Sequence, residues 1–284
     1  MTEPGGYARV LAFAQERHRV YLRRVAGLPW PWTDDEILRT YRFCNIYREL
    51  DATTLWLRRE WYDPHADDPD LWFAAAVARH ANLPATLGAV GYPVPWRPLE
   101  FIKCVQDRMD DGLPAYSGAY VICAVGGEWP SKAHYLAEAV LGPLWGRRAE
   151  IRPTPGEPLS VLWSRLSASY GLGSFMAAQV VADAKFCGAM ARAPDWWTFA
   201  APGPGSQRGL NRVLGRAVSA PWRLDDWRRE NEALRRHLDL ALLEDPEFFP
   251  LSAQDCQNTL CEFDKYERVR LGQGRPKQLF RRTT

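Results

Sequence analysis

The chain has 284 residues, of which 46% are hydrophobic and 25% are charged, and its formal net charge is +2. This size allows one large domain or two coupled subdomains, and the composition excludes a chain that is disordered throughout. The six cysteines form no C-x-x-C pair and no Cys/His cluster with zinc or iron–sulfur spacing, so we expect neither a metal nor a cofactor. Without a signal peptide or a membrane-length apolar run, the sequence predicts a cytoplasmic protein that does not enter a membrane.

Apolar residues recur at helical spacing along most of the chain. In the first half, this pattern predicts helices over residues 7–25, 33–50, 51–61, 68–81, 98–109 and 131–141. Thr33 and Glu36 have the spacing of a capping box at the start of the second helix. Residues 118–127 (GAYVICAVGG) alone have strand character, and a short ribbon or the start of a buried helix fits them equally well.

Residues 147–158 contain three prolines and are interpreted as a linker. The linker predicts an N-terminal helical subdomain over residues 1–150 and a second subdomain over residues 151–284, with one compact domain as the alternative. The second half has predicted helices over residues 159–169, 174–186, 206–216, 225–243 and 252–266.

The chain ends in a basic segment. Residues 265–284 contain one acid, Glu267, and seven basic residues: Lys265, Arg268, Arg270, Arg275, Lys277, Arg281 and Arg282. Such a tail either binds phosphates or is a solvated terminus, and both readings stay open. In the first reading, Arg275 and Lys277 contact DNA.

The segment YGLGSFMAAQ (170–179) predicts a helix-hairpin-helix element that binds a nucleic-acid backbone. Gly171 and Gly173 permit a tight turn with positive φ that can lie close to a phosphate. Ser174 then stands at the start of the next helix, where free N–H groups attract an anion. Phe175 occupies the position of the lysine in the G-x-G-x-K-T-A pattern of base-excision glycosylases, which argues against lyase chemistry. A plain connection between two helices is the alternative.

A second motif, DWWTFAAPGPGSQRGLN (195–211), contains a rigid Gly-Pro-Gly loop followed by a predicted helix. Ser206 is a candidate helix cap. The loop and the first helical turns are candidate phosphate-binding groups, and no Gly-Lys-Ser/Thr follows as in a P-loop. The candidates are Gly203, Gly205, Ser206, Arg208 and Asn211. A simple capping turn is the alternative.

Two further motifs mix charged, amide and aromatic residues at helical spacing. In YRFCNIYRELD (41–51), the residues expected on or beside one helix face are Tyr41, Asn45, Arg48 and Asp51. In DCQNTLCEFDK (255–265), one side of the predicted helix carries Asn258, Cys261, Glu262 and Lys265. Each motif fits either a site for a charged ligand or an exposed helix face with internal ion pairs.

The ordered set YRFCNIYRELD, GAY near residue 118, YGLGSFMAAQ, GPGSQRGLN and LCEFDKY resembles a family of phage thymine-hypermodification enzymes. That family includes the helical domain of 5-hydroxymethyluracil DNA kinases and the alpha-glutamyl/putrescinyl thymine pyrophosphorylases, also described as amino acid:DNA transferases. The resemblance covers residues 33–280. It implies a mainly α, DNA-glycosylase-like helical fold with a helix-hairpin-helix element.

The sequence has no G-x-x-x-x-G-K-[ST] motif, which favours the transferase branch over the kinase branch. The resemblance then implies a phage-encoded enzyme whose partners are double-stranded DNA carrying 5-phosphomethyl-uracil and a free amino acid, glycine. The amine displaces the phosphate to give 5-N-alpha-glycinylthymidine. Functional coupling to a DNA kinase is also implied.

This chemistry assigns expected roles to the candidate residues. The leaving phosphate needs cations, for which Arg48 and Arg208 lead, followed by Arg42 and Lys265. The amine needs a base, for which Asp51 and Asp264 lead and Asp195 comes third. The flipped base needs aromatic walls, for which the candidates are Tyr41, Trp196 and Trp197. Asn45 completes the candidate catalytic group, and a thiol of Cys44 or Cys261 adding to the uracil ring is a further alternative.

Three other functions remain open at this point. A DNA glycosylase-type hydrolase would release a modified base. A 5-hydroxymethyluracil DNA kinase would need an atypical nucleotide site. An accessory DNA-binding module would recruit a separate kinase and perform no chemistry itself.

Overall fold

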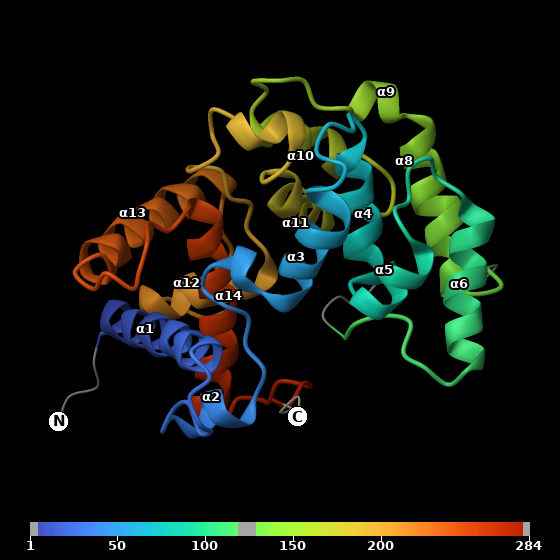
Figure 1. The fold of residues 1–284 in the computed structure, drawn as a ribbon. Helices are drawn as coiled ribbons and strands as arrows, with labels where there is room; N and C mark the ends of the chain where they lie inside the picture. The colour runs from blue at the N-terminus through green and yellow to red at the C-terminus, as the bar shows by residue number, and fades with distance from the viewer. Residues whose placement is uncertain (1–4, 119–128, 281–284) are drawn as a thin grey trace. The chain divides into compact units, whose positions relative to one another are not determined.

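A computed structural model describes residues 5–118 and 129–280 of the chain. Regular structure in these two ranges is helical, and an isolated antiparallel bridge between Tyr41 and Leu279 is their one strand-like pairing (Figure 1). The prediction of a mainly α protein is therefore confirmed. The expected strand-like stretch at residues 118–127 falls almost wholly outside the described residues. No helix in the described ranges is both long enough and apolar enough to cross a membrane.

The chain forms two compact units, and the first is built from both ends of the sequence. Unit 1 contains residues 1–51 and 197–284, and unit 2 contains residues 52–196. The helices of unit 1 are α1 (Gly6–Val25), α2 (Glu36–Thr40), η1 (Arg48–Leu50), α12 (Pro204–Val213), α13 (Leu224–Leu242) and α14 (Ala253–Arg270). The predicted boundary near residue 150 differs from this division, because residue 150 lies inside unit 2.

Unit 2 consists of shorter helices. They are α3 (Ala52–Leu57), η2 (Arg58–Tyr62), α4 (Leu71–Ala81), α5 (Pro84–Val90), α6 (Pro98–Asp110), α7 (Lys132–His134), η3 (Tyr135–Leu141), α8 (Gly142–Gly146), α9 (Arg148–Ile151), α10 (Leu159–Ser167), α11 (Gly173–Ala184) and η4 (Gly188–Arg192). The proline-rich segment expected to be a linker contains α9. It is tied into unit 2 by an ion pair between Arg152 and Asp70 at 2.7 Å.

The core of unit 1 forms where α1, α12, α13 and α14 pack on one another. Figure 1 shows α1 beside α12 and α14. Each helix buries one apolar stripe, represented by Phe13 on α1, Leu210 on α12, Trp227 on α13 and Phe263 on α14. Helices from the two ends of the sequence are therefore held together by one shared core, which places the 41–51 motif and α14 in the same unit.

In unit 2, α4 is buried along its whole length and packs against α11. A helix that is buried on all sides must pair any charge it carries. Arg79 on α4 does so, because its Nε donates to Asp183 Oδ2 on α11 at 2.6 Å and its Nη2 donates to Asp183 Oδ1. The Tyr62 hydroxyl donates to the same carboxylate at 2.9 Å. This network fixes the register of the two helices at the centre of the unit.

His80 on α4 makes the stability of unit 2 depend on pH. Burial lowers the pKa of His80 to about 4, and its Nδ1 lies 2.7 Å from the Ala76 carbonyl oxygen. Because the unfolded chain binds the proton near the ordinary pKa of 6.5, we expect stability to fall as the pH drops from 6.5 towards 4. The full loss is roughly 3 kcal/mol. Urea unfolding at pH 7 and pH 5 should show about 2 kcal/mol of this loss, because folded His80 is still mostly neutral at pH 5.

The His80→Gln variant isolates this contribution, because every other titrating group is shared with the wild-type chain. We expect the variant to lose less stability than the wild type between pH 7 and pH 5. Equal losses in both chains would show that His80 does not titrate in this way.

Candidate active site

Two segments that are distant in sequence lie together in unit 1, namely residues 42–51 and helix α14. The Cys44 N–H donates to Glu262 Oε2 at 2.8 Å, and the Asn258 amide donates to the Asn45 carbonyl oxygen at 2.7 Å. The Arg48 N–H reaches Asp255 Oδ1 at 3.4 Å. Side chains of α14 thus satisfy backbone groups that a helix would satisfy internally.

These contacts correct the prediction of a helix over residues 33–50. Helix α2 spans only Glu36–Thr40, and the chain is extended at Tyr41 before the short helix η1 begins at Arg48. The cap is Asp35 rather than Thr33, since Asp35 Oδ1 accepts from two backbone N–H groups of α2. Tyr41, Asn45 and Arg48 therefore do not share a helix face, because the backbone between them is bonded to α14.

Asp51 is the half-buried carboxylate at the centre of this arrangement. Its Oδ1 accepts from the Asn45 N–H at 2.8 Å. Burial raises the pKa of Asp51, and this effect outweighs the opposing influence of that hydrogen bond and of the Arg17 and Arg48 guanidiniums. A carboxylate with a raised pKa is a stronger base than an ordinary aspartate. We call Asn45, Arg48, Asp51, Glu262, Lys265 and Arg17 the Asp51 site.

Lys265 supplies a fixed positive charge to the Asp51 site. Its Nζ lies 2.7 Å from Glu262 Oε2, donates to the Arg42 carbonyl oxygen at 3.2 Å and stands 5.0 Å from the Phe43 ring centre. Burial alone would lower the pKa of Lys265, but the charge of Glu262 and its hydrogen bond outweigh burial and raise the pKa. Lys265 therefore remains an ammonium at neutral pH and serves as a cation rather than as a base.

Arg17 on α1 belongs to the site although no motif pointed to it. Its Nη2 and Nε donate to the Phe43 carbonyl oxygen at 3.0 and 3.3 Å. Its guanidinium is also one of the charges that lower the pKa of Asp51. In the sequence it is one of several basic residues on an amphipathic helix, and only the tertiary contact with residues 43–51 distinguishes it.

Asp264 has a different environment from Asp51, although both were candidate bases. Its side chain is 1% exposed and is held between Arg208 Nε and Arg212 Nε, each at 2.9 Å. A carboxylate that is buried and paired with two guanidiniums is poorly placed to accept a proton from a substrate. In the structure, Asp264 instead holds Arg208 and Arg212 in place. Asp195 is likewise a structural group, because it accepts from the N–H groups of Leu159 and Ser160 at the start of α10.

The Gly-Pro-Gly loop builds the start of α12 and its contact with α14. Ser206 is fully buried, and its hydroxyl exchanges hydrogen bonds with the backbone of Gly203. A Cβ atom at Gly205 would lie 2.3 Å from Cys261 Sγ, so the two helices touch there. Asn211 is also buried, and its amide donates to the carbonyl oxygens of Val218 and Ala220. The sequence predicted that Gly203, Ser206 and Asn211 contact DNA, but all three are buried and cannot do so. Arg208 is accessible.

The 170–179 segment lies in unit 2 between α10 and α11, which pack against each other. Gly171 and Gly173 adopt φ values of +80° and +58°, as the predicted tight turn requires. A Cβ atom at Gly171 would also lie 2.5 Å from Val140 Cγ2, so packing demands glycine there as well. Both glycines and Ser174 are exposed. Contact of this turn with a DNA backbone stays a prediction.

The three aromatic residues expected to form a base pocket are distributed over both units. Tyr41 packs against the core of unit 1, and Trp197, in the same unit, is 51% exposed. Trp196 belongs to unit 2, where its Nε1 donates to the Lys185 carbonyl oxygen and its ring lies 3.8 Å from Lys185 Nζ. Neither unit by itself therefore contains all three rings.

The basic C-terminal segment is anchored up to residue 280. The Arg42 N–H donates to the Gln278 carbonyl oxygen, and the Phe280 N–H donates to the Thr40 carbonyl oxygen. The Phe280 ring also stacks on Trp30 with a centroid distance of 5.3 Å. Arg275 and Lys277 are exposed within this anchored segment, while Arg281 and Arg282 lie outside the described residues.

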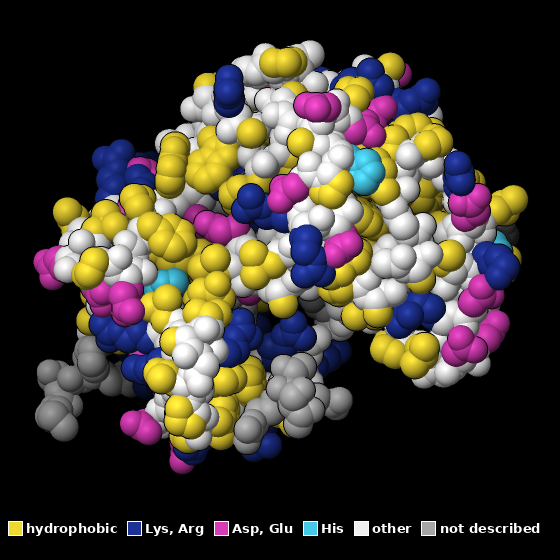
Figure 2. Space-filling view, viewed as in Figure 1, with side chains coloured by type: hydrophobic (Ala, Val, Ile, Leu, Met, Phe, Trp, Pro, Cys, Tyr) yellow, Lys and Arg dark blue, Asp and Glu magenta, His cyan; other side chains and the backbone are white. Residues whose placement is uncertain are grey.

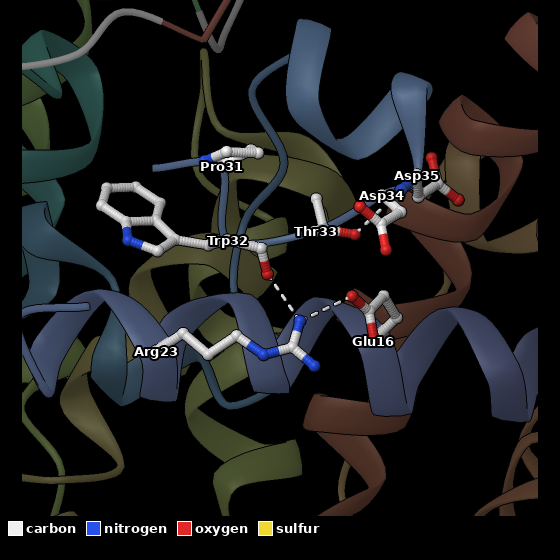
Figure 3. A pocket seen from close by; sticks show the side chains of 7 residues that line it. All are labelled: Glu16, Arg23, Pro31, Trp32, Thr33, Asp34 and Asp35. Carbon is white, nitrogen blue, oxygen red and sulfur yellow. Dashed lines mark hydrogen bonds and ion pairs between the residues drawn. The ribbon is translucent and has the colours of Figure 1, made fainter. Parts of the chain in front are cut away.

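A surface pocket of about 450 Å³ lies elsewhere in unit 1 (Figure 3). It is lined by Glu16, Arg23, Pro31, Trp32, Thr33, Asp34 and Asp35. Arg23 is already bonded to Glu16 and to the Trp32 carbonyl oxygen, as the dashed lines in Figure 3 show. Asp35 caps α2 and accepts from the Tyr266 hydroxyl at 2.6 Å. Because its charged groups serve internal contacts, we do not place the chemistry here.

A model of the family "5-hmdU DNA kinase, helical domain" matches residues 6–275. The chain belongs to this family. A curated relative, the 5-hmdU DNA kinase of Bacillus phage SP10, is 25% identical over 223 residues, which cover 70% of this chain and 34% of the relative. The chain thus spans about a third of the length of that relative. No solved structure matches it.

Family membership confirms the kinship that the order of the motifs predicted. The matched range includes every residue of the Asp51 site and the cluster around Asp264. Among the described residues, no group of three or more His, Cys, Asp or Glu side chains could hold a metal ion.

Proposed function

We propose that this protein modifies thymine-derived bases in phage DNA, as an amino acid:DNA transferase that acts on 5-phosphomethyl-deoxyuridine. The observation that carries the proposal is the Asp51 site, where a half-buried carboxylate with a raised pKa is influenced by the charges of Arg17 and Arg48, and where Lys265 pairs with Glu262. Membership of a family named for DNA kinases that act on 5-hmdU supports a modified pyrimidine in DNA as the substrate. The amine donor is a free amino acid, with glycine as the first candidate.

Asp51 removes a proton from the ammonium group of the amino acid, which frees the nitrogen lone pair. The amine nitrogen then attacks the 5-methylene carbon, a C–N bond forms, and the C–O bond to phosphate breaks. The phosphate leaves with both electrons of that bond. Lys265, which Glu262 holds in place before the reaction starts, stabilises the charge that develops on the phosphate, and Arg48 is the second cation proposed for this role. Asn45 positions Asp51 through its backbone N–H.

Phosphate transfer to 5-hydroxymethyl-deoxyuridine is the second candidate. The SP10 relative is named 5-hmdU DNA kinase, and two thirds of its length lies outside the matched region. In this reading, Asp51 takes the proton of the hydroxymethyl group, whose oxygen attacks the γ-phosphorus of ATP. The bond from that phosphorus to the bridging oxygen breaks and ADP leaves. A nucleotide site must be supplied by atypical residues or by another polypeptide segment. The absence of G-x-x-x-x-G-K-[ST] from this chain favours the transferase.

One assay separates the candidates. Purified protein is incubated with DNA that contains 5-phosphomethyl-deoxyuridine and glycine, and in parallel with DNA that contains 5-hydroxymethyl-deoxyuridine and ATP. The DNA is then digested to nucleosides and examined by mass spectrometry. A glycinyl nucleoside in the first reaction supports the transferase, and a phosphomethyl nucleoside in the second supports the kinase.

The same assay identifies the two remaining alternatives. Free base with abasic sites would indicate a glycosylase. Unchanged DNA in both reactions, with a panel of amino acids in place of glycine, would overturn both enzymatic readings and leave an accessory DNA-binding module.

The Cys261→Ala variant is expected to retain most of the transferase activity. Burial raises the pKa of Cys261 to about 12, so the side chain is a neutral thiol at physiological pH and a poor nucleophile. The nucleoside assay measures the activity, and thermal unfolding verifies the fold. A loss of turnover at unchanged stability would instead assign the thiol a direct role. The pKa of Cys44, the other thiol candidate, is raised as well, by burial and by the charges of Glu262 and Asp51, so the same argument applies to it.

A further inference from the structure

One buried carboxylate gathers three guanidiniums on the surface of unit 1. Asp264 Oδ2 lies 2.9 Å from Arg208 Nε and 3.5 Å from Arg268 Nε, and Asp264 Oδ1 lies 2.9 Å from Arg212 Nε. Arg208 and Arg212 come from α12, and Arg268 comes from α14 one turn beyond Asp264. We call Asp264, Arg208, Arg212 and Arg268 the Asp264 cluster.

The cluster carries more positive than negative charge. Its three guanidiniums share one carboxylate, and one turn further along α14 the buried Glu267 pairs with Arg9 at 3.3 Å and with Arg270 at 2.6 Å. Two buried acids thus face five guanidiniums, which leaves an excess of fixed cations. Figure 2 shows Lys and Arg side chains on the visible face of unit 1 near α1 and α14.

The two accessible arginines are held in place with binding capacity left over. The Arg208 and Arg268 side chains are 38% and 35% exposed, whereas that of Arg212 is 6% exposed. Arg208 Nε donates a hydrogen bond to Asp264 Oδ2, whereas Arg268 Nε forms an ion pair with the same oxygen at 3.5 Å without a hydrogen bond. The terminal N–H groups of both guanidiniums therefore remain available to bind a ligand. Because two positive guanidiniums share one carboxylate oxygen, a second anion beside them is favoured.

Further cations continue from the cluster along the anchored C-terminal segment. The Gln273 N–H donates to the Arg268 carbonyl oxygen at 2.7 Å, and Gln273 Oε1 accepts from Arg212 Nη2 at 2.8 Å. Two residues and four residues later come Arg275 and Lys277, both exposed. Several cations along one anchored segment match a repeating phosphate chain better than a single small anion.

We propose that Arg208 and Arg268, oriented by buried Asp264, bind a phosphate of the DNA backbone, and that Arg275 and Lys277 extend this contact to neighbouring phosphates. The choice of DNA as the polyanion rests on the proposed function. The contact is independent of sequence, because guanidinium groups that bind phosphates do not contact base edges. It assigns Arg208 to holding the DNA rather than to the leaving phosphate.

The test is the salt dependence of binding to an unmodified DNA duplex, followed by fluorescence anisotropy without any amino acid. Arg208→Gln and Arg268→Gln should each weaken binding at low salt by roughly tenfold. Each should also reduce the slope of log K against log salt by about one. Arg236→Gln is the matched control, because Arg236 is 74% exposed on α13 and pairs with Glu232 at the surface. Its affinity and slope should equal those of the wild type.

Thermal unfolding of each variant separates lost binding from lost folding, and Arg208→Lys supplies a second check because it keeps the charge and should restore the slope. Unchanged affinity and slope in both glutamine variants would overturn the proposal. A second outcome would also overturn it. If inorganic phosphate raises the thermal stability of the wild type but not of the glutamine variants, and these variants still bind DNA normally, the cluster binds free phosphate rather than DNA. Because the duplex carries no modified base, this binding test does not depend on the outcome of the transferase assay.

Discussion

The Asp51→Asn variant is expected to lose amino acid transfer to DNA by a factor of about 10²–10⁴ in turnover, the usual contribution of a general base. The substitution removes the proton acceptor but keeps the geometry, because an amide oxygen can still accept the Asn45 N–H. Affinity for unmodified DNA should not change. The glycinyl nucleoside formed per unit time measures the loss, and Asp225→Asn, which alters an exposed acid in the first turn of α13, is the control.

The same substitution should leave the fold intact or slightly more stable at neutral pH. Burial raises the pKa of Asp51, so ionising it costs folding free energy above its ordinary pKa of 3.8. A neutral amide removes that cost. Lost turnover together with unchanged or raised thermal stability is the signature expected of a catalytic carboxylate. Lost turnover with a large drop in stability would instead indicate a structural carboxylate.

The pH profile of the transferase provides a further readout for Asp51. The base acts only when ionised, so turnover should fall as the pH drops through the raised pKa of Asp51. This acidic limb should therefore lie above the pH expected for an ordinary aspartate. In Asp51→Asn, the small residual activity should lack that limb.

The Gly209→Ala variant is expected to destabilise the protein by about 3 kcal/mol or more. A Cβ atom at Gly209 would lie 2.1 Å from the Leu260 carbonyl oxygen, and the nearest obstacle is backbone rather than a side chain that can move. Helices α12 and α14 would have to separate, which would also disturb Arg208 and Asp264. Thermal unfolding should show a Tm lower by roughly 10 °C.

Gly88→Ala is the matched control for this experiment. Gly88 also lies within a helix, but the nearest atom to an added Cβ is Trp56 Cζ2 at 3.6 Å, an ordinary contact. This substitution should be neutral or should stabilise the protein by up to about 1 kcal/mol. Equal effects of the two substitutions would contradict the close approach of α12 and α14.

The sequence alone determined the helical class and the local requirements of several turns. Hydrophobic periodicity predicted helices that the structure contains, such as α1, α13 and α14, because an apolar stripe at helical spacing must be buried. The glycine pair at residues 171 and 173 was rightly read as a tight turn, since positive φ is a property of the local backbone. The order of the motifs also identified the family.

Only the tertiary structure distinguishes the surroundings of the two candidate carboxylates. In the sequence Asp51 and Asp264 are two acids in similar polar motifs, but packing gives Asp51 one backbone donor, the Asn45 N–H, and holds Asp264 between two arginines. The conformation of the chain between Tyr41 and Arg48 was also decided by the tertiary structure, because its residues have helical spacing but the backbone is extended at Tyr41. Its backbone binds α14 side chains that lie more than 200 residues away, as for Cys44 and Glu262. Local patterns cannot report hydrogen bonds over such separations, so fold class and turns follow from the sequence whereas the site follows from packing.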